Sequence, residues 1–131
     1  MRIMIDTNVL VSALLFPNER MNRLIYKIVT EHTLVISSYV TEELLQVTRR
    51  KFKGKVEMVD QFLSQLPYEL VYTPKQPKMG LFEIRDEADY PVLYTAIVDD
   101  VDLFITGDRD FEGLDLERPE ILTPSEFLDR Y

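Results

Sequence analysis

Apolar runs of strand length alternate with helical patterns along this chain, and the alternation limits the folds that it can adopt. The runs that we interpret as strands are residues 2–6, 34–36, 69–72, 102–105 and 121–122. Parallel strands need a crossover connection, usually a helix, so strands separated by helices favour a mostly parallel sheet with helices on both faces. We therefore expect one three-layer α/β/α domain spanning residues 1–131.

The segments between these runs carry apolar residues at helical spacing. The predicted helices are about residues 8–16, 21–29, 40–47, 56–66 and 87–99, with a short helix near Phe111. A last helix begins at Thr123, because Thr123-Pro124-Ser125-Glu126 has the spacing of a capping box with proline at the first helical position. Residues 73–85 contain two prolines and a glycine and form the longest predicted loop.

Four acidic residues stand where this architecture brings distant segments together. Asp6 closes the first predicted strand and Asp108 the fourth, whereas Glu43 and Asp89 lie on the inward faces of two helices. Ligands of open α/β sheets bind beyond the carboxyl ends of the strands, so we expect these acids to meet at that edge. Clustered carboxylates raise each other's pKa unless a cation neutralises them. Mg²⁺ or Mn²⁺, which prefer oxygen ligands, are the predicted cofactors.

Each acid also has a purely structural interpretation. Asp6 can cap the helix that follows it, and Asp89 can interact with the dipole of its own helix, which we expect Asp86 to cap. Glu43 can extend its carboxylate into water at the rim of the fold. Asp108 and Asp110 flank a tight turn, where aspartate is common. Four acids at four predicted positions around one sheet edge nevertheless favour a shared site over four separate caps.

The net charge of −8 at first disfavours a nucleic-acid partner. Bound cations would cancel part of this charge, and the basic residues are concentrated in one segment. This basic segment contains, within seven residues, Arg49, Arg50, Lys51, Lys53 and Lys55. It is either the solvated end of a helix and its loop or a surface for the phosphates of a nucleic acid.

Several classes of protein are excluded by residues that the chain lacks. There is no cysteine, which excludes disulfides and thiol catalysis, and the single His32 argues against a Ser-His-Asp mechanism. Asp6 and Asn8 interrupt the apolar start, so it is not a signal peptide. No run approaches the roughly 20 apolar residues that a membrane span needs. We expect a cytoplasmic protein with no membrane partner.

Four motifs, in order along the chain, resemble those of the PIN domain. They are Asp6-Thr7-Asn8-Val9, Glu43-Leu44, Asp86 to Leu93, and Thr106 to Phe111. The segment from Ile121 to Leu128 is similar to the bacterial and archaeal branch of VapC-like toxin components of toxin–antitoxin pairs. PIN domains are metal-dependent ribonucleases with a five-stranded parallel sheet of order 3-2-1-4-5, so the resemblance implies this fold and this activity.

The resemblance also implies roles for individual residues. The acidic site, catalytic and metal-binding, would comprise Asp6, Glu43, Asp89 and Asp108, with Asn8, Thr106 and Asp110 as supporting polar residues. The expected reaction is Mg²⁺- or Mn²⁺-assisted hydrolysis of RNA phosphodiester bonds, with the basic segment on the RNA. An antitoxin protein and a second copy of the chain, forming a homodimer, are the expected partners. Glu87 and Tyr90 differ from the residues that relatives often carry there, which bears on substrate fit.

Other classes that gather acids at a sheet edge fit less well. A haloacid-dehalogenase-type phosphatase needs a second aspartate two positions after Asp6, where this chain has Asn8. A receiver-type signalling domain needs a lysine after its last strand, and this chain has none in Ile121-Leu122-Thr123-Pro124. A Toprim site expects glutamate in place of Asp6. The remaining alternative is a catalytically silent PIN-like module that binds RNA or protein, and the presence of all four acids argues against it.

Overall fold

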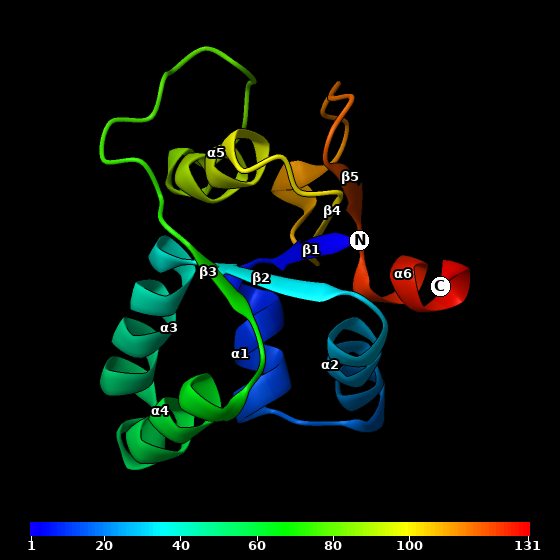
Figure 1. The fold of residues 1–131 in the computed structure, drawn as a ribbon. Helices are drawn as coiled ribbons and strands as arrows, with labels where there is room; N and C mark the ends of the chain where they lie inside the picture. Colours follow the sequence, from blue (N-terminus) through cyan, green and yellow to red (C-terminus); the bar gives the residue numbers. More distant parts are fainter.

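A central strand, β1 (Arg2–Ile5), organises the sheet in the computed structural model, which describes residues 1–131. The other strands are β2 (Thr33–Ser37), β3 (Glu69–Val71), β4 (Leu103–Ile105) and β5 (Glu120–Leu122). All pair in parallel, in the order β3-β2-β1-β4-β5 (Figure 1). The predicted α/β class and strand order are therefore confirmed.

The strand order reverses between β1 and β4, and this is the feature that positions the site. Ile5 pairs with Ile105, so the two strands end side by side. The backbone N–H of Asp6 continues this pairing by donating to the carbonyl of Ile105 at 3.2 Å. Residues that directly follow β1 and β4 are therefore neighbours, at the switch point where open α/β sheets bind ligands.

Helices cover both faces of the sheet. They are α1 (Thr7–Leu15), α2 (Glu19–Glu31), α3 (Ser38–Lys51), α4 (Val56–Gln65), α5 (Tyr90–Val98) and α6 (Pro124–Arg130), with 3₁₀ turns η1 (Lys53–Lys55), η2 (Glu87–Asp89) and η3 (Arg109–Phe111). Figure 1 shows α5 on one side of the sheet, α1 to α4 on the other, and α6 beside α2. No helix is both long and apolar enough to cross a membrane.

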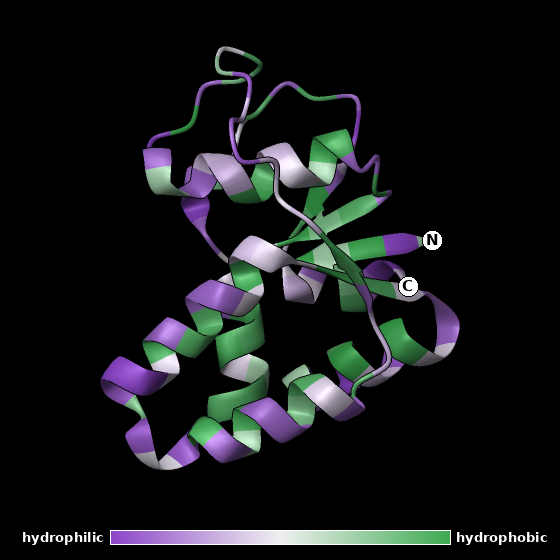
Figure 2. Cartoon of the chain, turned by 60° about the vertical axis from the view of Figure 1, so that its left-hand side comes forward, coloured by the Kyte–Doolittle hydropathy of each residue, from purple (hydrophilic) through white to green (hydrophobic).

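The core follows the hydropathy of the sequence. Ile3, Met4 and Ile5 of β1 have no exposed surface, and α1 is mainly apolar because it packs between α2 and α3. Figure 2 shows the strands mainly in green, whereas the outer helices alternate between purple and green. This pattern agrees with strands buried on both faces and with amphipathic helices around them.

Among the helix boundaries that differ from the prediction, two matter for the site. Helix α3 runs from Ser38 to Lys51 instead of residues 40–47, because the Ser37 hydroxyl caps it by accepting the N–H of Val40 at 3.2 Å. The last turn of α3 therefore carries Arg49, Arg50 and Lys51, where cations stabilise the helix dipole. The predicted helix 87–99 begins as the 3₁₀ turn η2, and α5 starts only at Tyr90.

Candidate active site

Asp6 is both a helix cap and a buried acid. One carboxylate oxygen, Oδ1, accepts the N–H of Val9 at 2.9 Å and caps α1, while Oδ2 accepts the hydroxyl of Thr106. The residue is 5% exposed. Burial raises its pKa to about 6, helped by the charges of Asp108 and Glu43 and opposed by its two hydrogen bonds. The structural interpretation of Asp6 as a cap is therefore confirmed, and its role in a site stays a prediction.

Asp89 ends η2 with one oxygen lacking any hydrogen-bond partner. Its Oδ2 atom is buried and accepts no hydrogen bond, which is an unfavourable state for a carboxylate oxygen. Burial raises the pKa of Asp89 to about 7, and the charge of Asp108 adds to the rise, followed by smaller contributions from Asp86, Asp110 and Asp6. A half-buried acid with such an oxygen is stabilised by a proton or by a cation.

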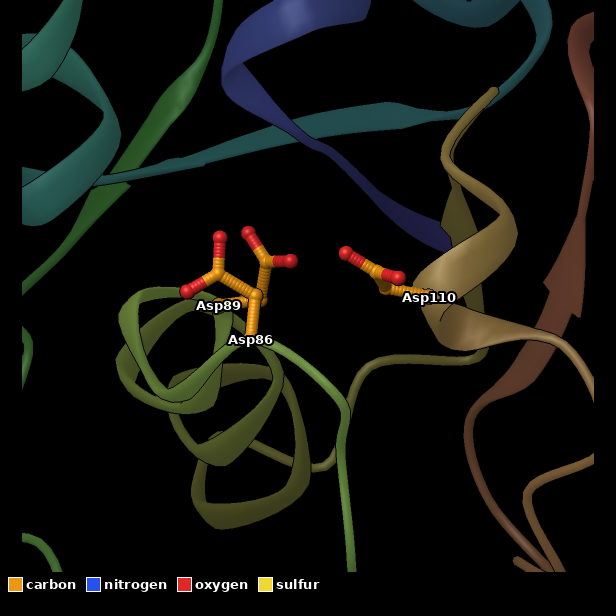
Figure 3. A group of neighbouring side chains, drawn as sticks. All are labelled: Asp86, Asp89 and Asp110. Atoms are coloured by element: carbon orange, nitrogen blue, oxygen red, sulfur yellow. The ribbon is translucent and has the colours of Figure 1, made fainter.

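Asp86, Asp89 and Asp110 form the tightest group of acids. Each offers one oxygen that lies within 4.8 Å of the others. Figure 3 shows Asp86 and Asp89 side by side at the start of α5, with Asp110 directed toward them from η3. Sequence reasoning interpreted Asp86 only as a cap, a role that it does fill by accepting the N–H of Ala88 at 3.0 Å. It missed that this cap stands beside Asp89.

Asp108 and Thr106 connect the acids that follow β1 and β4. The Thr106 hydroxyl donates to Asp6 and accepts the N–H of Asp108 at 3.0 Å. Asp108 in turn accepts the N–H of Asp110 at 2.9 Å and so caps η3. Thr106 is 3% exposed, so these contacts fix the turn after β4 from inside the fold. This arrangement agrees with a supporting role for Thr106.

Glu43 reaches the same region from α3. Its carboxylate accepts the hydroxyl of Thr7, a contact that sequence reasoning missed although Thr7 lies inside the Asp6-Thr7-Asn8 motif. Glu43 lines a hollow of about 220 Å³ together with Asp6, Asn8 and Asp89. Three of the four predicted acids thus share one hollow. Asp108 lines neighbouring hollows and acts on Asp6 and Asp89 through its charge.

The basic segment is divided by the structure. Arg50 lines the hollow of Glu43, because residues seven apart on α3 share a face. The other four residues are exposed and line none of the hollows described here; they are Arg49, Lys51, Lys53 and Lys55. Only one of the five predicted RNA-binding residues therefore borders the acids.

None of the site acids forms a salt bridge. The ion pairs of the protein involve Arg2, Lys27, Arg118 and Arg130, and their acidic partners lie elsewhere. The donor set is made of carboxylate oxygens, and the Asp89 Oδ2 atom is buried without a partner. Both observations fit a hard divalent cation, which takes oxygen ligands and satisfies such an atom.

Comparison with known proteins identifies the class of fold and then the family. The sequence model of the PIN domain matches residues 2–110, so the chain belongs to the PIN domain family. A chain of VapBC2 from Rickettsia felis, bound to a DNA fragment from its promoter, is similar over 94% of this chain and 98% of its own, with a TM-score of 0.71 and 21% identity. A chain of DNA-bound VapBC from Salmonella typhimurium is similar over 95% and 98%, with a TM-score of 0.70 and 16% identity. At these identities the likeness concerns the fold. No curated protein matches the chain.

Proposed function

We propose that this protein is a metal-dependent endoribonuclease and the toxin of a toxin–antitoxin pair, with residues 1–131 acting as one nuclease domain in the cytoplasm. The observation that carries the proposal is the buried, unpartnered Asp89 Oδ2 among carboxylates that come from different elements of one sheet edge. Membership of the PIN domain family supports nuclease chemistry.

The proposed Mg²⁺ or Mn²⁺ ligands are Asp6, Asp89 and Asp108, with Glu43 on a second ion or on the attacking water. Asp86 and Asp110 complete the oxygen donors around Asp89. When bound, such an ion supplies Lewis-acid chemistry: it acidifies a water molecule and offsets charge on the scissile phosphate.

The protein's own side chains hold these acids in place. The Thr106 hydroxyl orients Asp6, and the Thr7 hydroxyl orients Glu43. Val92 and Phe111 form apolar walls of the hollow and limit the access of bulk water. Arg50 supplies a positive charge on the same hollow, where it would contact an RNA phosphate.

The similar solved structures support an antitoxin partner, because both are described as VapBC assemblies. We accordingly propose an antitoxin-type protein as the partner that controls the nuclease, and a homodimer as the state of the free chain. The four residues of the basic segment that do not line the acidic hollow remain proposed contacts for RNA; they are Arg49, Lys51, Lys53 and Lys55.

The proposal is tested by cleavage of single-stranded RNA with Mg²⁺, Mn²⁺ or EDTA. Glu43→Gln should lower the rate by about 100-fold, because the hollow loses one of its charges. Glu42→Gln is the matched control, since Glu42 is the exposed neighbour of Glu43 on α3 and should leave the rate unchanged. RNA binding without cleavage under every metal condition would instead favour the catalytically silent PIN-like module.

A further inference from the structure

A second hollow adjoins the acidic one and has the opposite charge. Its volume is about 540 Å³, and Asn8 lines both hollows. Two arginines line it, Arg20 from α2 and Arg109 from η3, against a single acid, Asp108. The remaining lining residues are uncharged, and among them Ser12 of α1 adds a hydroxyl. This balance is unusual in a protein with a net charge of −8.

Neither arginine is neutralised by a carboxylate. Arg2, Arg118 and Arg130 all form salt bridges, whereas Arg20 and Arg109 form none. Arg20 makes one hydrogen bond, from Nη1 to the Ser125 hydroxyl at 2.9 Å, which leaves its other guanidinium donors free. A guanidinium with free donors matches the oxygens of a phosphate and can bind two of them at once.

We propose that Arg20 and Arg109 bind the RNA phosphate next to the one that is cleaved. The inference rests on the proposed function, because it places the scissile phosphate at the acids. An RNA strand whose scissile phosphate lies at the acids carries its next phosphate one nucleotide away. Asn8 lines both hollows, so the hollow of Arg20 and Arg109 lies directly beside the acidic hollow and can receive that phosphate. RNA is favoured over an acidic protein segment because its phosphates recur at a fixed spacing along the strand.

The test is the salt dependence of RNA binding by the double variant Arg20→Gln/Arg109→Gln, measured by fluorescence anisotropy with a single-stranded oligonucleotide and Mn²⁺. Each lost phosphate contact should flatten the slope of log K against log salt by about 0.7 on a single strand. Binding at physiological salt should weaken by about tenfold, and KM for cleavage should rise more than kcat falls.

Two single variants separate this role from simpler ones. Arg23→Gln removes one charge from the same helix at an exposed position outside this hollow, and its salt slope should equal that of the wild type. Ser125→Ala removes the Arg20 hydrogen bond and keeps the charge, so it should also bind RNA normally.

The outcomes distinguish the subsite from the proposed function. A wild-type protein that cleaves RNA, with an unchanged slope in the double variant, overturns the subsite and leaves the nuclease in place. A flatter slope in the double variant, with no cleavage by the wild type, shows that the two arginines contact RNA phosphates, but it overturns the proposed function and with it the placement beside a cleaved phosphate. Equal losses in Arg23→Gln or Ser125→Ala overturn the subsite by showing a general charge or packing effect, and a wild type that does not bind RNA overturns both.

Discussion

The two ends of the same sheet use acidic residues in opposite ways. At the amino end, Arg2 hydrogen-bonds to Glu69 and Asp99, and its backbone N–H donates to Asp102 at 2.7 Å. Asp102 also pairs with Arg118 at 2.8 Å. At the carboxyl end, the acids of the candidate site have hydroxyl and backbone N–H partners but no ion pair.

This difference separates acids that are paired with arginines from acids whose charge has no ionic partner in the fold. At the amino end, hydrogen bonds with Glu69 and then Asp99 raise the pKa of Arg2 above its usual range, so that network favours its charged form. At the carboxyl end, burial and then neighbouring acidic charges raise the pKa of Asp6 and of Asp89, so these surroundings disfavour the charged carboxylates. The same residue type therefore contributes stability at one edge and electrostatic strain at the other.

The largest expected effect comes from neutralising one acid at each end. At pH 8, Asp89→Asn should reduce RNA cleavage by about 100-fold and leave the metal-free protein as stable or more stable, because it removes a charge from an uncompensated group. Asp102→Asn should keep cleavage and lower stability by about 0.5 to 1 kcal/mol, since it loses the ion pair with Arg118. Urea unfolding and a cleavage assay measure both variants. Equal destabilisation with retained cleavage would assign Asp89 a structural role only, through the dipole of α5.

The second largest expected effect is a change in the stability of the metal-free protein with pH. A carboxyl group whose folded pKa is raised takes up protons on folding between its unfolded and folded pKa values, so stability falls as pH rises through that window. For Asp6 the window runs from 3.8 to about 6, and for Asp89 from 3.8 to about 7. In EDTA, the wild type should therefore lose stability between pH 4 and pH 7 relative to the double variant Asp6→Asn/Asp89→Asn. Denaturant melts across this range measure the difference, and parallel curves would show that the two acids are not strained.

The smallest expected effect lies within the basic segment. Arg50 lines the acidic hollow and Arg49 does not. Arg50→Gln should therefore flatten the slope of log K for RNA binding against log salt by about 0.7, and Arg49→Gln should flatten it by less. The two substitutions remove the same charge from adjacent positions of α3, which makes them matched controls for each other. Equal slopes for both variants would show that the segment acts only as a diffuse positive surface.

The fold was predictable because its local signals agree with one another. Apolar runs of strand length alternate with segments whose apolar residues repeat at helical spacing. The capping box at Thr123 forms as predicted, and the Glu126 carboxylate accepts the N–H of Thr123 at 3.1 Å. The convergence of Asp6, Glu43 and Asp89 was predicted from strand ends and helix faces, and the structure brings these three to one hollow. Their catalytic roles stay a prediction.

The features that sequence reasoning missed depend on contacts between distant segments. Asp86 caps η2 by a local rule, and only the fold shows that it also stands beside Asp110. Arg20 and Arg109 lie 89 positions apart, on different elements, and no local pattern indicates that they share a hollow. The division of the basic segment depends on where α3 ends, and helix ends are set by capping contacts that propensity alone does not locate.

The acids at the carboxyl edge of the sheet are proposed to form a site for a divalent cation. The most direct measurement is the melting temperature of the wild type and of Asp89→Asn at pH 8, in EDTA and in millimolar Mg²⁺ or Mn²⁺. A ligand at a hundredfold excess over its Kd stabilises the folded state by about 2.7 kcal/mol. We expect a rise of several degrees in the wild type with either ion and a smaller rise in the variant. Identical melting temperatures in metal and in EDTA would contradict a cation site at these acids.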